Sequence, residues 1–100
     1  MIILKNPWGY TNASMYSYRR YYDGNNIIVE VTLPGTEKKD IKLRYRPDSQ
    51  SLCIFVKERE EQEIPIYKEI DPDNVTAKLE LGVLKITLPF RHTDKEIKIE

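Results

Sequence analysis

The chain has 100 residues, of which 16 are Lys or Arg and 16 are Asp or Glu, so its formal net charge at pH 7 is zero. A chain of this length forms one small domain that buries only about 60 to 65% of its extended surface, so we expect self-association to add stability. Zero net charge provides no overall field to attract nucleic acid or an anionic membrane, and neither is expected as a partner.

The first 22 residues are rich in aromatic side chains. Arg19 and Arg20 accompany them, so stacking on nucleic-acid bases is one interpretation. Tyrosine and tryptophan also bury large areas at low entropic cost, which favours contacts between subunits or with partly unfolded proteins. Packing of the tyrosines as an edge strand is an equally good interpretation. The candidate assembly or client contacts are Trp8, Tyr10, Tyr16, Tyr18, Tyr21 and Tyr22.

The rest of the chain alternates between apolar and polar residues in short segments separated by turn residues. Asp23-Gly24-Asn25-Asn26 is typical of a hairpin turn, and Pro34-Gly35 and Pro47-Asp48-Ser49 end later segments. Short antiparallel strands at regular intervals predict an all-β sandwich. The expected strands are residues 16–22, 27–33, 41–46, 52–56, 64–70, 75–81 and 84–88.

Few side chains suggest a chemical site. The acidic run Glu58 to Glu63 contains Arg59 and is interpreted as a solvated loop and not a cation site. Cys53 is the only cysteine and His92 the only histidine, which excludes an intrachain disulfide and a Cys/His zinc site. Cys53 is expected to be a small packed residue. No nucleophile and base set or phosphate-binding loop can be assembled, so we expect no catalysis, no metal and no cofactor.

Two motifs near the C-terminus are the most informative part of the chain. Val75, Ala77, Leu79 and Leu81 alternate with polar residues, which predicts a strand with one buried face. Gly82 then interrupts the pattern, as at a tight turn that requires positive φ.

The charged tail contains Ile97 and Ile99, which point the same way only if the segment is extended. Such a segment can add to a sheet edge and place both side chains in pockets.

These two motifs resemble the end of a small heat-shock protein of the archaeal type. The box runs from Ala77 to the turn residues Gly82, Val83 and Leu84, and the tail motif is Ile97-Lys98-Ile99. The segment Val29–Gly35 is similar to the family's strand ending in L-P-G. The resemblance implies an immunoglobulin-like antiparallel β-sandwich, the α-crystallin domain, at residues 23–90.

The resemblance also implies an aromatic-rich arm at residues 1–22, a tail at 91–100 and a groove that receives the tail of a neighbouring subunit. Ile97 and Ile99 are the implied plug. The implied groove residues are Ile41, Leu43, Tyr45, Val75, Ala77, Leu79 and Leu81.

The chain differs from the family pattern in its short arm and in a shortened loop after the strand that begins at Leu52. Archaeal, bacterial and plant members usually place a long exchanged strand there. We therefore expect any dimer to pair by strand edges or through the tyrosine-rich arm.

The resemblance implies an ATP-independent holdase: a homo-oligomeric chaperone that binds partly unfolded client proteins, prevents their aggregation and catalyses nothing. The alternative is a p23-like co-chaperone or adaptor domain that docks on one defined protein. No stretch has the roughly 18 apolar residues of a membrane span, and residues 1–5 lack the basic start of a signal peptide, so we expect a cytoplasmic protein.

Overall fold

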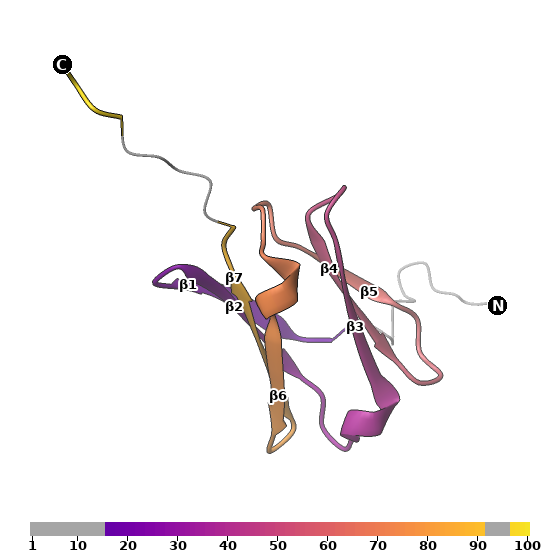
Figure 1. The fold of residues 1–100 in the computed structure, drawn as a ribbon. Helices are drawn as coiled ribbons and strands as arrows, with labels where there is room; N and C mark the ends of the chain where they lie inside the picture. Colours follow the sequence, from indigo (N-terminus) through magenta and orange to yellow (C-terminus); the bar gives the residue numbers. More distant parts are fainter. Residues whose placement is uncertain (1–15, 92–96) are drawn as a thin grey trace.

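The computed structural model describes residues 16–91 and 97–100, and in these ranges the chain forms two antiparallel sheets that face each other (Figure 1). In spatial order, the strands of the four-stranded sheet are β1 (Tyr18–Asp23), β2 (Asn26–Thr32), β7 (Val83–Pro89) and β6 (Thr76–Glu80). Those of the three-stranded sheet are β3 (Ile41–Arg46), β4 (Ser51–Val56) and β5 (Gln62–Pro65). Two short 3-10 helices, η1 (Lys38–Asp40) and η2 (Pro72–Asn74), precede β3 and β6.

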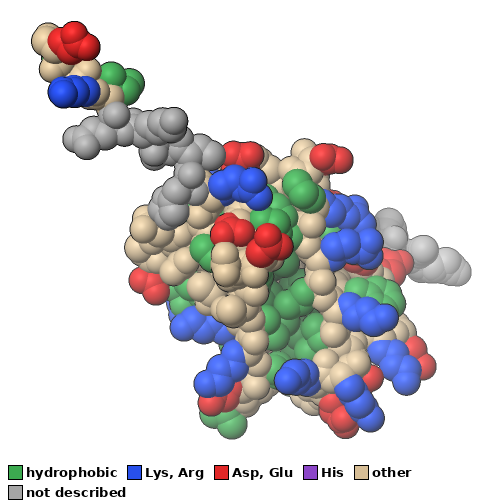
Figure 2. All heavy atoms as spheres, viewed as in Figure 1, with side chains coloured by type: hydrophobic (Ala, Val, Ile, Leu, Met, Phe, Trp, Pro, Cys, Tyr) green, Lys and Arg blue, Asp and Glu red, His purple; other side chains and the backbone are tan. Residues whose placement is uncertain are grey.

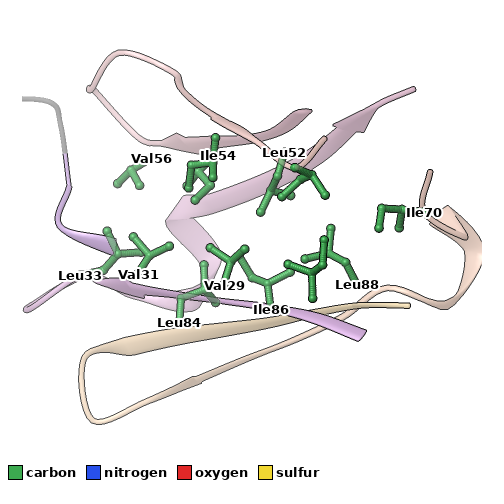
Figure 3. Close-up of a cluster of buried hydrophobic side chains, with 13 residues drawn as sticks. Val29, Val31, Leu33, Leu52, Ile54, Val56, Ile70, Leu84, Ile86 and Leu88 are labelled. Atoms are coloured by element: carbon green, nitrogen blue, oxygen red, sulfur yellow. The ribbon is translucent and has the colours of Figure 1, made fainter. Parts of the chain in front are cut away.

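The core lies between the sheets and is built almost entirely from aliphatic side chains (Figure 3). Alternate residues of β2, β4 and β7 point inward, because successive side chains of a strand face opposite sides of its sheet. Burying one such aliphatic side chain contributes about 1.5 to 3 kcal/mol, so the three central strands provide most of the hydrophobic stabilisation. The buried cluster is Ile27, Val29, Val31, Leu33, Leu52, Ile54, Val56, Ile64, Ile66, Ile70, Leu84, Ile86 and Leu88.

The turn at residues 23–26 has the predicted geometry. Asp23 pairs with Asn26 across a two-residue loop, and Gly24 has φ +62°. A two-residue loop with glycine at its first position matches the right-handed twist of the flanking strands. The hairpin fixes the β1–β2 register, in which Tyr21 lies opposite Ile28.

The strand that we expected over residues 64–70 is shorter than predicted. β5 spans Gln62–Pro65, so two residues of the expected charged loop belong to it. Beyond Pro65, Tyr67 takes a left-handed φ of 63°, which turns the chain away from the sheet, and Ile70 makes only an isolated bridge to Phe90. A strand cannot continue through such a residue.

The boundary between arm and sandwich also differs from the one expected. β1 starts at Tyr18, so residues 18–22 belong to the four-stranded sheet although they fall in the segment that we assigned to an arm. No helix in the described ranges is long and apolar enough to cross a membrane.

Candidate functional site: an apolar groove between two sheet edges

An apolar groove of about 410 Å³ runs between β3 and β6, which are edge strands of different sheets. Figure 2 shows it as a hollow strip of hydrophobic side chains with Lys and Arg side chains to either side. It is lined by Lys38, Ile41, Leu43, Ala77, Lys78, Leu79 and Leu84.

The groove exists because both flanking strands have inward-facing apolar residues and no further strand beside them. Ile41 and Leu43 from β3 and Leu79 from β6 are only half-buried and pack against the core cluster. Leu84 from β7 belongs to the core cluster itself. Since each edge strand leaves a row of backbone N–H and C=O groups unpaired, the groove offers hydrogen bonds as well as apolar surface to an extended chain.

The groove also has basic residues. Lys38 comes from η1 and Lys78 from β6, and the Lys78 Nζ lies 3.8 Å from the Glu80 carboxylate at the exposed end of the strand. A surface pair of this kind is weak, so Lys78 remains able to interact with another anion.

Four of the seven predicted groove residues line the groove, and three do not. The structure brings together Ile41, Leu43, Ala77 and Leu79 as expected. The alternation pattern does not indicate that Lys38 and Lys78 line the groove, and the family resemblance places Leu84 only in the box turn. Strand alternation does indicate that Leu84 faces inward, but it does not reveal that η1 brings Lys38 to this end of the groove.

Tyr45, Val75 and Leu81 lie outside the groove. The Tyr45 hydroxyl donates to the Lys68 carbonyl oxygen at 2.9 Å, and the ring lines a separate cavity of about 180 Å³. Burial raises the pKa of Tyr45. Val75 follows η2 and packs against the core.

Leu81 is 99% exposed because β6 ends at Glu80 and the chain turns there. It has φ +51° and Gly82 has φ +77°, so the period-two pattern that placed Leu81 on the inner face does not extend into the turn. Gly82 therefore has the predicted positive φ, and Val83 and Leu84 begin β7.

The two isoleucines of the tail do not occupy the groove of their own chain. Ile97 is 84% exposed and Ile99 is 91% exposed, and neither lines the groove. In the part of the chain that the structure describes, the groove is thus open and its expected plug is solvent-exposed.

The aromatic residues of the predicted arm lie away from the groove. Trp8 and Tyr10 are outside the described residues. Tyr16 packs against the core, whereas Tyr18 and Tyr22 are exposed on β1.

Tyr21 faces the outer side of the sheet, where its hydroxyl donates to the Glu30 carboxylate at 2.7 Å. Arg19 donates to the same carboxylate at 2.7 Å. The two donors lower the pKa of Glu30, and the hydrogen bond to Glu30 raises the pKa of Tyr21. These contacts hold the three side chains together on the outer face of the sheet, while the backbone ladder sets the position of β1 on β2.

In the described ranges, no three His, Cys, Asp or Glu side chains are grouped so that they could hold a metal ion. Cys53 is 1% exposed, and burial raises the pKa of its thiol. This agrees with the interpretation of Cys53 as a packed residue.

Comparisons with known proteins give one family and several similar structures. Residues 18–89 match the family model described as the CS domain. Heat shock protein 16.0 from Schizosaccharomyces pombe is 28% identical, with a TM-score of 0.64 over 85% of this chain and 97% of that chain. A Del-C4 mutant of hsp14.1 from Sulfolobus solfataricus is 27% identical, with a TM-score of 0.68 over 76% of this chain and 75% of that one.

A small heat-shock protein from Xylella fastidiosa is 19% identical, covers 86% of this chain and 94% of that chain, and has a TM-score of 0.67. This likeness concerns the fold alone. Among curated proteins, no match was found.

Proposed function

Because this chain belongs to the CS domain family and has the β-sandwich fold of small heat-shock proteins, we propose that it is an ATP-independent holdase. The family and the fold class are those that the sequence predicted. The proposal concerns what the groove binds, how the chain assembles and whether client proteins are protected.

The open groove between β3 and β6 is the observation that supports this function best. A partly unfolded protein exposes extended apolar segments. Such a segment can pair its backbone with a sheet edge and place alternate side chains in the groove. Binding the unfolded ensemble in this way holds it back from aggregation by mass action and requires no nucleotide.

The tail of another subunit fits the same groove. In an extended tail, Ile97 and Ile99 lie about 6.7 Å apart, which equals the spacing between Ile41 and Leu43 on β3. Ile97 and Ile99 of an extended tail point to the same side, and Lys98 points to the other, so both isoleucines can enter the groove together. The apolar spacing therefore favours the tail as the occupant in the resting assembly.

Energetics make this contact reversible. Burying two isoleucines yields roughly 3 to 6 kcal/mol, whereas association costs about 4 to 15 kcal/mol in lost freedom. One tail in one groove is weak, but several reciprocal tails in a closed assembly raise the effective concentration of each. A tail can then leave a groove and a client segment can enter it.

The remaining parts of the chain take the roles that the family resemblance implies. Residues 1–22 act as an aromatic-rich assembly or client-binding segment, part of which is β1. Residues 23–90 together with β1 form the α-crystallin domain, and residues 91–100 the tail. The partners are further copies of the chain and unfolded client proteins in the reducing cytoplasm, and there is no catalysis.

The test of the holdase is suppression of thermal aggregation. Purified protein is mixed with several unrelated client proteins at near-equal molar ratio, and light scattering is followed on heating with and without ATP. We expect suppression that ATP does not change. Absence of suppression for every client and temperature contradicts the holdase.

A second candidate is an adaptor of the p23-like type, which the match to the CS domain favours. An adaptor binds one defined partner and works as a small monomer. A strict monomer in solution that protects no client would support the adaptor, whereas a discrete oligomer that protects several clients would support the holdase.

A further inference from the structure

At the outer edge of β1, which lies at the opposite end of the four-stranded sheet from the groove, backbone N–H and C=O groups have no strand beside them in the described residues. β1 is the first strand of the four-stranded sheet and pairs only with β2. All its residues except Tyr21 are exposed. The strand has no proline, no lysine and no bulge, which are the usual means of blocking an edge.

The register shows which backbone groups face outward. Thr32 donates its N–H to the Ser17 carbonyl oxygen, and Asp23 and Asn26 close the two-residue hairpin. In an antiparallel pair, hydrogen-bonded positions alternate with positions whose N–H and C=O point away. The odd-numbered residues of β1 are therefore bonded to β2, and the outward groups belong to Tyr18, Arg20 and Tyr22.

By the same alternation, the backbone N–H and C=O of Tyr16 also point away from β2. At this position a side chain of the same chain provides the hydrogen-bond partner. The Tyr16 N–H donates to the Gln62 Oε1 at 2.7 Å, and the Gln62 Nε2 donates to the Tyr16 carbonyl oxygen at 3.4 Å. The buried Gln62 side chain thus replaces a neighbouring strand at this one position. At Tyr18, Arg20 and Tyr22 no backbone partner for the outward groups is present in the described residues.

We propose that a second copy of this chain pairs with this edge, β1 against β1, in an antiparallel two-fold arrangement centred on Tyr21. In this register Tyr21 lies opposite its own counterpart, Arg20 lies opposite Tyr22, and Arg19 lies opposite Asp23. In each copy the even-numbered side chains of β1 share the core face of the sheet with Val29 and Val31, and the odd-numbered ones lie on the outer face. Because this register places odd residues opposite odd residues and even opposite even, the two four-stranded sheets join with their core faces on the same side.

Charge complementarity selects this register among those that the alternation allows. A two-fold axis at Arg20 or at Arg19 would place that arginine directly opposite itself, and like charges opposite each other destabilise a sheet. An axis at Tyr22 leaves only residues 21–23 to pair. With the axis at Tyr21, no charged residue lies opposite a like charge. Arg19, which pairs with Glu30 of its own chain but is 72% exposed, lies opposite the exposed Asp23 of the second copy. Arg20, whose guanidinium donates to the Pro65 carbonyl oxygen of its own chain at 2.7 Å, lies opposite the uncharged Tyr22.

The pairing rests on β1 alone and does not depend on holdase activity. Its test is disulfide cross-linking of the full chain in a Cys53→Ala background, in which an introduced cysteine is the only thiol. Tyr21→Cys places two cysteines at a non-hydrogen-bonded pair, where Cα atoms are about 4.5 Å apart and a disulfide forms readily. The matched control, Tyr22→Cys, leaves the two Cα atoms about 8 Å apart, which is beyond disulfide reach.

We expect the Tyr21→Cys variant to form a covalent dimer under mild oxidation, about tenfold faster than Tyr22→Cys or more. Equal rates or a faster reaction of Tyr22→Cys overturns the register. No dimer from either variant overturns the pairing itself and favours occupation of the edge by residues 1–15 of the same chain or by another protein.

A second measurement separates the backbone pairing from the side chain. In the Ile97→Ser, Ile99→Ser background, Tyr22→Pro removes the outward N–H that the second copy needs, while Tyr22→Ala removes only the ring. We expect a dimer with Tyr22→Ala and a monomer with Tyr22→Pro in sedimentation, with circular dichroism showing both folded. Equal masses of the two variants overturn the proposal.

Discussion

The residue that departs most from local preference is Leu81. A leucine with φ +51° adopts a left-handed conformation that costs about 1 to 2 kcal/mol, and its side chain is almost fully exposed. Asparagine adopts this conformation at lower cost and is polar. Neither backbone geometry nor burial explains the leucine at this position.

Leu81→Asn is therefore expected to stabilise the protein by about 1 kcal/mol, because the backbone strain falls while no buried contact is lost. For a domain of this size that corresponds to an increase in Tm of about 4 to 8 °C. Thermal unfolding followed by circular dichroism measures the shift. A lower Tm would contradict the strain that we assign to Leu81, and Leu81→Ala is the control that removes the side chain but keeps a strained conformation.

Cys53 provides a prediction on reactivity and pH. The raised pKa keeps the folded thiol protonated above 9.0, the ordinary value, where the unfolded thiol ionises first. Its contribution to stability is thus complete below pH 9.0 and is lost as the pH rises through the folded value. We expect iodoacetamide at pH 8 to modify Cys53 in the folded protein at least about tenfold more slowly than in urea. Equal rates would show that the thiol is accessible.

At the scale of elements, the sandwich has four edge strands, and they differ in how they are protected. β5 has only four residues and ends at Pro65, which limits pairing at its edge. β3 and β6 flank the apolar groove. β1 is open at its outer groups beyond the position capped by Gln62. The edges most able to bind another chain are therefore β1 and the two beside the groove.

A bulky cation inside the groove is expected to expel its occupant. Ala77 lies on β6 with its side chain exposed in the groove, so Ala77→Arg fills the space without removing a core side chain. Thr76→Arg is the matched control, since Thr76 is exposed on the opposite face of the same strand. Ala77→Arg is expected to lower the mass of the assembly and to reduce client protection, measured by light scattering, while Thr76→Arg leaves both unchanged. The same effect from both variants would contradict the groove as the binding site.

The sequence predicted the elements better than it predicted the site. The alternation of apolar and polar residues and the turn residues were sufficient to predict the hairpin at Gly24 and the turn at Gly82, because both depend on neighbouring residues in the sequence. Leu81 was misplaced because a period of two has no information on where a strand ends. Lys38 was missed because its position in the groove depends on how η1 packs against the other sheet, which is a contact between distant parts of the chain.

For the whole molecule, the small core and the open edges both favour assembly. Among residues 16–91 and 97–100, nothing covers the groove, the outer edge of β1 or the side chains of Ile97 and Ile99 in a single copy. Two kinds of contact can cover them: β1 against β1, and a tail in a groove. Together they would build a closed oligomer from dimers.

The contribution of the N-terminal segment can be separated from that of the sandwich. Deleting residues 1–15 removes Trp8 and Tyr10 and leaves β1 intact, since β1 starts at Tyr18. We expect the truncated protein to remain folded and to protect clients less well in the aggregation assay. Unchanged protection would mean that Trp8 and Tyr10 have no part in client binding.

The measurement that tests the central claim most directly is the solution mass of the Ile97→Ser, Ile99→Ser variant by multi-angle light scattering. The claim is that the tail closes the assembly by binding the groove between β3 and β6 of a neighbouring copy. We predict that the double variant falls to dimers or monomers with its sandwich folded, while Lys98→Ala, which changes the residue between the isoleucines, keeps the wild-type mass. Retention of the wild-type mass by the double variant would contradict the account.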